Sequence, residues 1–160
     1  MKAKIIFLKK ALPFCLLAIL LGINSRLHSQ IIYTDIPDAT PNASYPLDLN
    51  NDLIVDFIIQ FDVIDKVMCK PQNNNAYLGD SVGGEHFPWA LSQSTNICNS
   101  LTTWYDSSNV GTMAWGTSIG HWTGETNKFL ALKLIVGANT YYGWTRLDLD
   151  PTSTSFTIKD

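Results

Sequence analysis

The sequence predicts an all-β domain built as an antiparallel β-sandwich, jelly-roll-like or Ig-like, with few or no helices after the N-terminal leader. Apolar and polar residues alternate along several short segments, which is the period of a half-buried strand. The acidic residues are twelve Asp against two Glu, and Asp favours turns over helix interiors. No convincing amphipathic helix pattern occurs in residues 30–160, so we expect strands to form the core.

Strands can be assigned in order along the chain. The first covers residues 53–61, in which every second residue is large and apolar. Residues 129–136 and 140–149 predict a hairpin, because two β-rich segments flank a Gly-Ala-Asn turn. Residues 155–159 alternate again and predict the last strand of a C-terminal meander. Residues 70–127 are rich in Asn, Ser, Thr and Gly, which predicts long loops.

The N-terminus has the layout of a signal peptide. Four lysines precede an apolar run over residues 11–23, which is shorter than the about 20 residues that a membrane-spanning helix needs. A polar stretch follows, and we expect cleavage after Ser29. Residues 1–29 are therefore predicted to be a signal peptide. Residues 30–160 are predicted to be a single domain, secreted or held at the cell surface, with no membrane span.

Removal of this leader makes the chain strongly acidic. Five of the eleven basic residues lie in the leader and none of the fourteen acidic ones does, which leaves six against fourteen, a net charge of −8. This charge argues against binding of nucleic acid or anionic lipid, because both select clustered Lys and Arg. It favours the binding of a cation.

One nine-residue segment, Asp-Leu-Asn-Asn-Asp-Leu-Ile-Val-Asp, carries the sharpest local signal. Its oxygen-bearing side chains occupy the first, third, fifth and ninth positions, a spacing that suits Ca²⁺: Asp48, Asn50, Asp52 and Asp56. The sixth position is Leu53, where such loops carry Gly because the backbone turns there with a positive φ. The segment predicts a Ca²⁺ site, and the alternative is an Asx-rich turn ahead of a strand.

Cys69 and Cys98 are the only cysteines left after the leader. An even number of cysteines in an exported chain predicts a disulfide between them. The alternative is two unpaired thiols, because sequence gives no distance between the two positions.

The leader that ends before a Gln, the Asp-rich loop and the segment Tyr142-Gly143-Trp144-Thr145-Arg146-Leu147 together resemble a group of secreted Bacteroidota proteins of uncharacterised function. In that group the loop usually carries Gly where this chain has Leu53, and a C-terminal sorting domain often follows the hairpin. The resemblance covers the first third and the last quarter of residues 30–160, and it implies an architecture but no activity. Because the chain ends at Asp160 without that sorting domain, we expect a short member or a truncated frame.

All five Trp residues follow the leader, and four lie in or beside the loop-rich middle. Exposed indoles stack on sugar rings, and Asp and Asn beside them can bind hydroxyl groups. Trp89, which follows Pro88, and Trp122, which follows His121, are therefore predicted to bind a ligand, with a glycan as the expected class. The alternative for any one Trp is burial in the core.

A secreted hydrolase acting on glycans is the alternative function. Glu85 with Glu125, or His86 with His121, would supply its acid and base groups. No nucleophile elbow, HExxH helix or CxxC pair accompanies them, so no catalytic residue is assigned. We expect a non-catalytic, calcium-stabilised protein that binds carbohydrate or a surface partner. A structural fragment of a larger exported protein is the third alternative.

Overall fold

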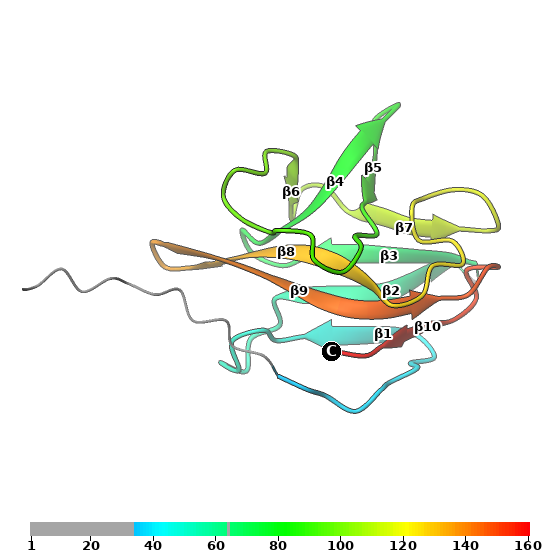
Figure 1. Ribbon diagram of the computed structural model, residues 1–160, viewed down its shortest axis with the longest axis horizontal. Coiled ribbons are helices and arrows are strands. Elements are labelled where there is room, and N and C mark those ends of the chain that lie inside the picture. Colours follow the sequence, from blue (N-terminus) through cyan, green and yellow to red (C-terminus); the bar gives the residue numbers. More distant parts are fainter. Residues whose placement is uncertain (1–33, 64) are drawn as a thin grey trace, which may run out of the picture. The chain divides into compact units, whose positions relative to one another are not determined.

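The computed structural model describes residues 34–63 and 65–160, so the signal peptide predicted for residues 1–29 lies outside the described residues. Residues 34–160 form one compact unit. The described residues contain ten strands and no helix (Figure 1), which confirms the all-β prediction. The strands are β1 Ser44–Leu47, β2 Phe57–Val63, β3 Lys66–Pro71, β4 Ala76–Val82, β5 Glu85–Pro88, β6 Trp104–Asp106, β7 Gly111–Trp115, β8 Lys128–Val136, β9 Asn139–Leu149 and β10 Phe156–Ile158.

The strands form one sheet in the order β1-β2-β3-β7-β5-β4-β8-β9-β10, with β6 paired to β4 beside this path. Neighbouring strands are antiparallel except β5 and β7, which are parallel through His86 and Gly111. The sheet is therefore mixed, although an antiparallel one was predicted. Parallel neighbours need a long connection, and residues 89–110 supply it between β5 and β7.

Strand β4 joins the two halves of this sheet, which are β1-β2-β3-β7-β5 on one side and β8-β9-β10 on the other. Its first residues, Ala76 and Tyr77, pair with β8, and the stretch from Gly79 to Val82 pairs with β5. At Gly79 the backbones approach so closely that a Cβ atom would lie 2.3 Å from the Phe87 carbonyl oxygen. Only glycine fits this position, because real Cβ atoms do not approach backbone atoms so closely.

Both halves of the sheet contribute side chains to one core, as expected for a sandwich. In strands β2, β9 and β10 the alternation decides which residues these are, because every second side chain points into the core. The largest fully buried members are Trp122, Tyr77, Phe57, Phe156, Ile59, Met113, Leu130, Leu132, Leu147, Leu149 and Ile158.

The predicted strand at residues 53–61 begins later than its alternation suggests. β2 starts at Phe57, and Leu53 is 95% exposed because residues 48–56 are used by a loop. The C-terminal hairpin is confirmed, because β8 and β9 pair along their length, from Lys128 with Leu147 to Val136 with Asn139. The two-residue turn between them begins with Gly137, which has a φ of 60°.

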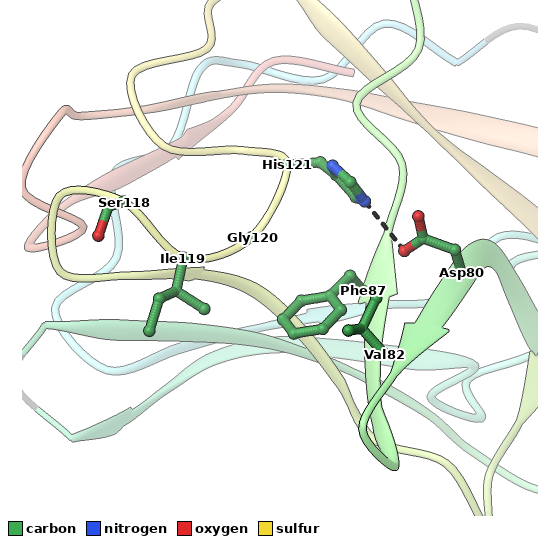
Figure 2. Close-up of a pocket in the computed structure, with 7 residues that line it drawn as sticks. All are labelled: Asp80, Val82, Phe87, Ser118, Ile119, Gly120 and His121. Atoms are coloured by element: carbon green, nitrogen blue, oxygen red, sulfur yellow. Dashed lines mark hydrogen bonds and ion pairs between the residues drawn. The ribbon is translucent and has the colours of Figure 1, made fainter.

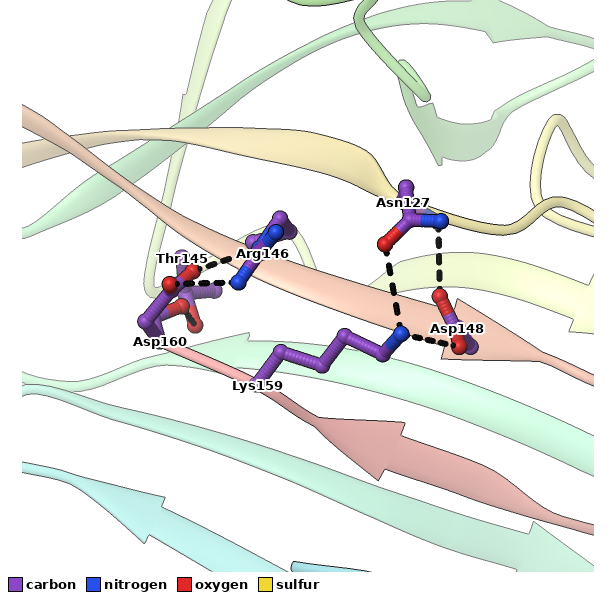
Figure 3. A network of polar contacts seen from close by, with 6 residues as sticks. All are labelled: Asn127, Thr145, Arg146, Asp148, Lys159 and Asp160. Carbon is purple, nitrogen blue, oxygen red and sulfur yellow. Dashed lines mark hydrogen bonds and ion pairs between the residues drawn. The ribbon is translucent and has the colours of Figure 1, made fainter. Parts of the chain in front are cut away.

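The last strand, β10, is held at both edges. Its Ile158 pairs with β9 on one side and exchanges two backbone hydrogen bonds with Ala39 on the other. Ion pairs link β9 to the end of the chain after β10 (Figure 3). Arg146 donates two hydrogen bonds, of 2.8 and 2.7 Å, to the Asp160 carboxylate. Beside this pair, Lys159 lies 2.9 Å from Asp148. Strand β10 therefore has hydrogen-bonded partners on both sides.

The predicted disulfide is wrong, because Cys69 and Cys98 are both free thiols. Cys69 lies on β3 with its side chain fully buried in the core, and burial raises its thiol pKa. Cys98 lies in the connection before β6, where its Sγ is 3.1 Å from the Ser100 hydroxyl. The core position of one thiol and the surface position of the other keep them apart.

Asn75 ties the loop before β2 to strand β8. Its side-chain amide donates to the backbone and the side chain of Asp56, each at 3.2 Å, and its oxygen accepts from the Ile135 amide at 2.8 Å. Asn75→Ala removes the donor to the Asp56 Oδ1 atom and the acceptor of the Ile135 amide, while the Asp56 carbonyl keeps the Gln72 amide as a donor. We therefore expect a loss of roughly 2–4 kcal/mol in the free energy of unfolding. Urea unfolding measures this loss. The exposed neighbour is the control: Asn74→Ala should change stability little, and equal losses in both variants would contradict this role.

Candidate functional site

The predicted metal ligands lie together in the loop between β1 and β2, where they hold backbone amides. Asp48 accepts from the amides of Asp52 and Leu53 at 3.2 and 2.8 Å. Asp52 accepts from the Ile54 amide at 2.8 Å, and the Asn50 amide group donates to Asp52 at 3.0 Å. These are the contacts of an Asx-rich turn.

The loop also shows the backbone conformation that its sequence predicts at the sixth position. Leu53 has a φ of 69° and Asn51 a φ of 56°, so two non-glycine residues occupy the left-handed region. Such a conformation costs roughly 1 kcal/mol or more for a residue with a Cβ atom. The strain is offset by the side-chain contacts that fix the turn.

Asp56 is the last residue of the loop, and it is buried. Burial raises its pKa, and the charges of Asp48 and Asp52 add to this, against hydrogen bonds from the Leu49 amide and Asn75. Burial is the larger effect, and the nearby charges of Asp48 and Asp52 are the smaller one. In the part of the chain that the structure describes, no three His, Cys, Asp or Glu side chains converge as they would around a metal ion.

Three of the four residues considered for hydrolysis have separate side-chain partners, and the fourth, Glu85, is exposed. His86 packs edge-on against Tyr105 with a ring-centroid distance of 4.5 Å. Glu125 forms an ion pair with Lys128 at 3.5 Å, and Glu85 is exposed at the start of β5. His121 pairs with Asp80, whose role the sequence did not suggest.

The two tryptophans predicted to bind a ligand have different positions. Trp122 is fully buried in the core, so its prediction as an exposed ligand-binding residue is wrong. Its Nε1 has no hydrogen-bond partner among the described residues. Trp89 is half-buried, and its side chain hydrogen-bonds Asp80. Among the tryptophans, Trp115 has an exposed side chain, with 44% of the residue accessible to solvent.

A shallow pocket of about 360 Å³ lies between the β4–β5 hairpin and the turn after β7 (Figure 2). The hairpin supplies Asp80, Val82 and Phe87, and the turn supplies residues 118–121. Figure 2 shows Ile119 across from Phe87, with the His121–Asp80 contact at one side. The walls are mostly apolar, and one polar pair marks the rim.

The polar pair joins two residues that lie 41 positions apart in the sequence. His121 Nε2 is 2.9 Å from Asp80 Oδ1, and both side chains are partly exposed. Partial burial raises the pKa of Asp80, but hydrogen bonds from His121 and Trp89 and the charge of His121 outweigh it and lower the pKa. The Asp80 side chain is therefore held in its ionised form, and its carboxylate offers a hydrogen-bond acceptor at the pocket.

Exposed apolar side chains continue from the pocket across the neighbouring strands. Val82 and Ile119 line it and are both exposed. Ile119 pairs with Trp115 through a backbone bridge, and Trp115 pairs with Lys66 of β3, whose Nζ lies 5.1 Å from the indole centroid. Cross-strand partners share a face, so the indole and the pocket adjoin one another.

The sequence offered only a weak signal for this pocket. Asp80 is the single charged residue in the otherwise uncharged strand β4, and a charged residue inside a strand indicates an exposed edge or a site. Nothing in the sequence pairs it with His121, because the contact depends on the sheet order. No protein-family model, curated protein or solved structure matches this chain.

Gly120 places His121 at the pocket. Its φ is 88°, and a Cβ atom there would lie 2.2 Å from the Met113 carbonyl oxygen. Gly120→Ala should therefore displace the turn, lower the free energy of unfolding by more than about 2 kcal/mol and break the His121–Asp80 contact. Thermal unfolding and the NMR shift of the His121 ring report the two effects.

Gly137→Ala is the matched control for this substitution. Gly137 has a φ of 60°, but a Cβ atom there would meet no other atom within 4 Å. Alanine at this position therefore costs only the backbone strain, roughly 1 kcal/mol. Equal losses in both variants would show that the close approach to Met113 is unimportant.

Proposed function

We propose that this chain is an exported, non-catalytic carbohydrate-binding domain whose binding site is the Asp80–His121 pocket together with the indole of Trp115. The observation that carries the proposal is the juxtaposition of a polar pair, apolar walls and an exposed indole on adjoining strands. A sugar ring has an apolar face and a rim of hydroxyl groups, so it matches both kinds of surface.

Each part of the site has a chemical role in this proposal. The Asp80 carboxylate accepts hydrogen bonds from hydroxyl groups, and Trp89 and His121 hold it in position. Phe87 and Ile119 cover the apolar face of a ring. The separate partners of His86, His121 and Glu125 favour binding over hydrolysis, because acid–base catalysis needs such groups to converge on one bond.

We also propose that Ca²⁺ stabilises the loop between β1 and β2. Asp48, Asn50, Asp52 and Asp56 would hold the ion, because carboxylate and amide oxygens are the ligands that Ca²⁺ prefers. The burial of Asp56, with the charges of Asp48 and Asp52 nearby, supports the proposal, since a bound cation would favour the ionised form of this carboxyl group. The ion would brace the strained turn and take no part in sugar binding.

Export rests on the predicted signal peptide at residues 1–29, and the resemblance to secreted Bacteroidota proteins is consistent with it. Among the described residues no helix is long and apolar enough to cross a membrane. The strongly acidic composition after the leader favours a glycan or protein partner over nucleic acid.

Sugar binding is tested by screening residues 30–160 against immobilised glycans and measuring hits by calorimetry. Asp80→Asn should weaken binding at least tenfold, because the amide group replaces one acceptor by a donor. Trp104→Ala removes an indole outside the site and should leave the affinity unchanged. Loss of binding in both variants, or retention in Asp80→Asn, would count against the pocket.

Calcium binding is tested by thermal unfolding of residues 30–160 in EDTA and in millimolar Ca²⁺. At a concentration a hundred times its dissociation constant, a ligand stabilises by about 2.7 kcal/mol, so the midpoint should rise by several degrees. Asp52→Ala should abolish the response, whereas Asp38→Asn, outside the loop, should retain it. An unchanged midpoint in the unsubstituted protein would leave the loop an Asx-rich turn.

A further inference from the structure

We infer that the site has two subsites and takes the end of a neutral glycan: one terminal ring in the Asp80–His121 pocket and the next ring on Trp115. This inference rests on the proposed function and specifies its ligand. It follows from three properties of the described residues, which are the size of the pocket, the position of the indole and the charges around both.

The pocket is small. Its volume of about 360 Å³ lies near the lower end of the range for small-molecule sites, about 300–1,000 Å³. It has walls on two sides, from the hairpin residue Phe87 and the turn residue Ile119. This space suits one sugar ring, with its hydroxyl groups at Asp80 and its apolar face against Phe87.

The indole lies outside the pocket and next to it. Trp115 does not line the pocket, but its backbone pairs with Ile119, which does. Lys66 covers part of the ring system, and 44% of the residue is still exposed. A second ring that leaves the pocket over Ile119 reaches this indole, so the two surfaces act on successive rings of one chain.

The surrounding charges select against acidic sugars. The β4–β5 hairpin carries Asp80 and Glu85, and the end of β2 and the turn after it carry Asp62 and Asp65. Lys66, the cation beside the indole, lies 3.6 Å from Asp62. A uronate or sulfate group would meet net negative charge, whereas a neutral ring would not.

The experiment is calorimetric titration of residues 30–160 with neutral oligosaccharides of one to four rings, from gluco-, manno- and galacto-series, and with oligogalacturonates of matched length. For the series that binds, we expect the affinity to rise about tenfold from one ring to two and then to level off. Oligogalacturonates should bind at least tenfold more weakly than galacto-oligosaccharides.

Two substitutions separate the subsites. Trp115→Phe and Trp115→Ala should progressively remove the gain from the second ring, whereas Trp104→Ala, outside the site, should keep the affinities for one ring and for two. Asp80→Asn should weaken every length alike. A steady rise to four rings, an equal effect of Trp115→Ala on one and two rings, or preferred binding of uronates would overturn the two-subsite inference while sugar binding itself stands. No binding of any neutral or acidic probe would contradict the proposed function.

Discussion

Strand β4 is shared between the two halves of the sheet, and most of the structure depends on that arrangement. Tyr77 and Asp80 point to opposite faces of this strand, so Tyr77 is fully buried in the core while Asp80 reaches the pocket. Gly79 lies between them and allows β5 to approach closely enough to pair. Because the same strand pairs with β8 at its start, a shift by one residue would turn Tyr77 outward and Asp80 inward.

The two proposed sites lie at opposite ends of this strand. Asn75, the residue before β4, holds the buried Asp56 at the base of the acidic loop. At the far end Asp80 is held by His121 and Trp89. A single strand therefore links the proposed calcium site to the proposed sugar site. The constraint is mechanical, since both groups keep their positions only while β4 keeps its register.

The sequence predicted what depends on local pattern. The alternation in residues 129–149 indicated the hairpin with its turn, and the spacing of Asp48, Asn50 and Asp52 indicated a tight loop. In this loop Leu53 adopts the positive φ that glycine usually supplies. It missed what depends on contacts between distant strands. Trp115 and Trp122 are close in sequence, yet Trp122 fills the core and Trp115 is exposed, because the turn at Gly120 reverses the chain between them. The prediction of a disulfide was wrong for the same reason, since no local pattern shows that the Cys69 side chain points into the core.

Native-state hydrogen exchange of residues 30–160 tests the central role of β4 most directly. The Gly79 amide donates to the Thr103 carbonyl and the Trp89 amide to the Leu78 carbonyl, so both report on the edges of this strand. If β4 holds the sheet together, these amides exchange only through global unfolding and are among the best protected in the chain. Exchange at these two positions that is faster than at the Ala39 and Ile158 amides would contradict the account.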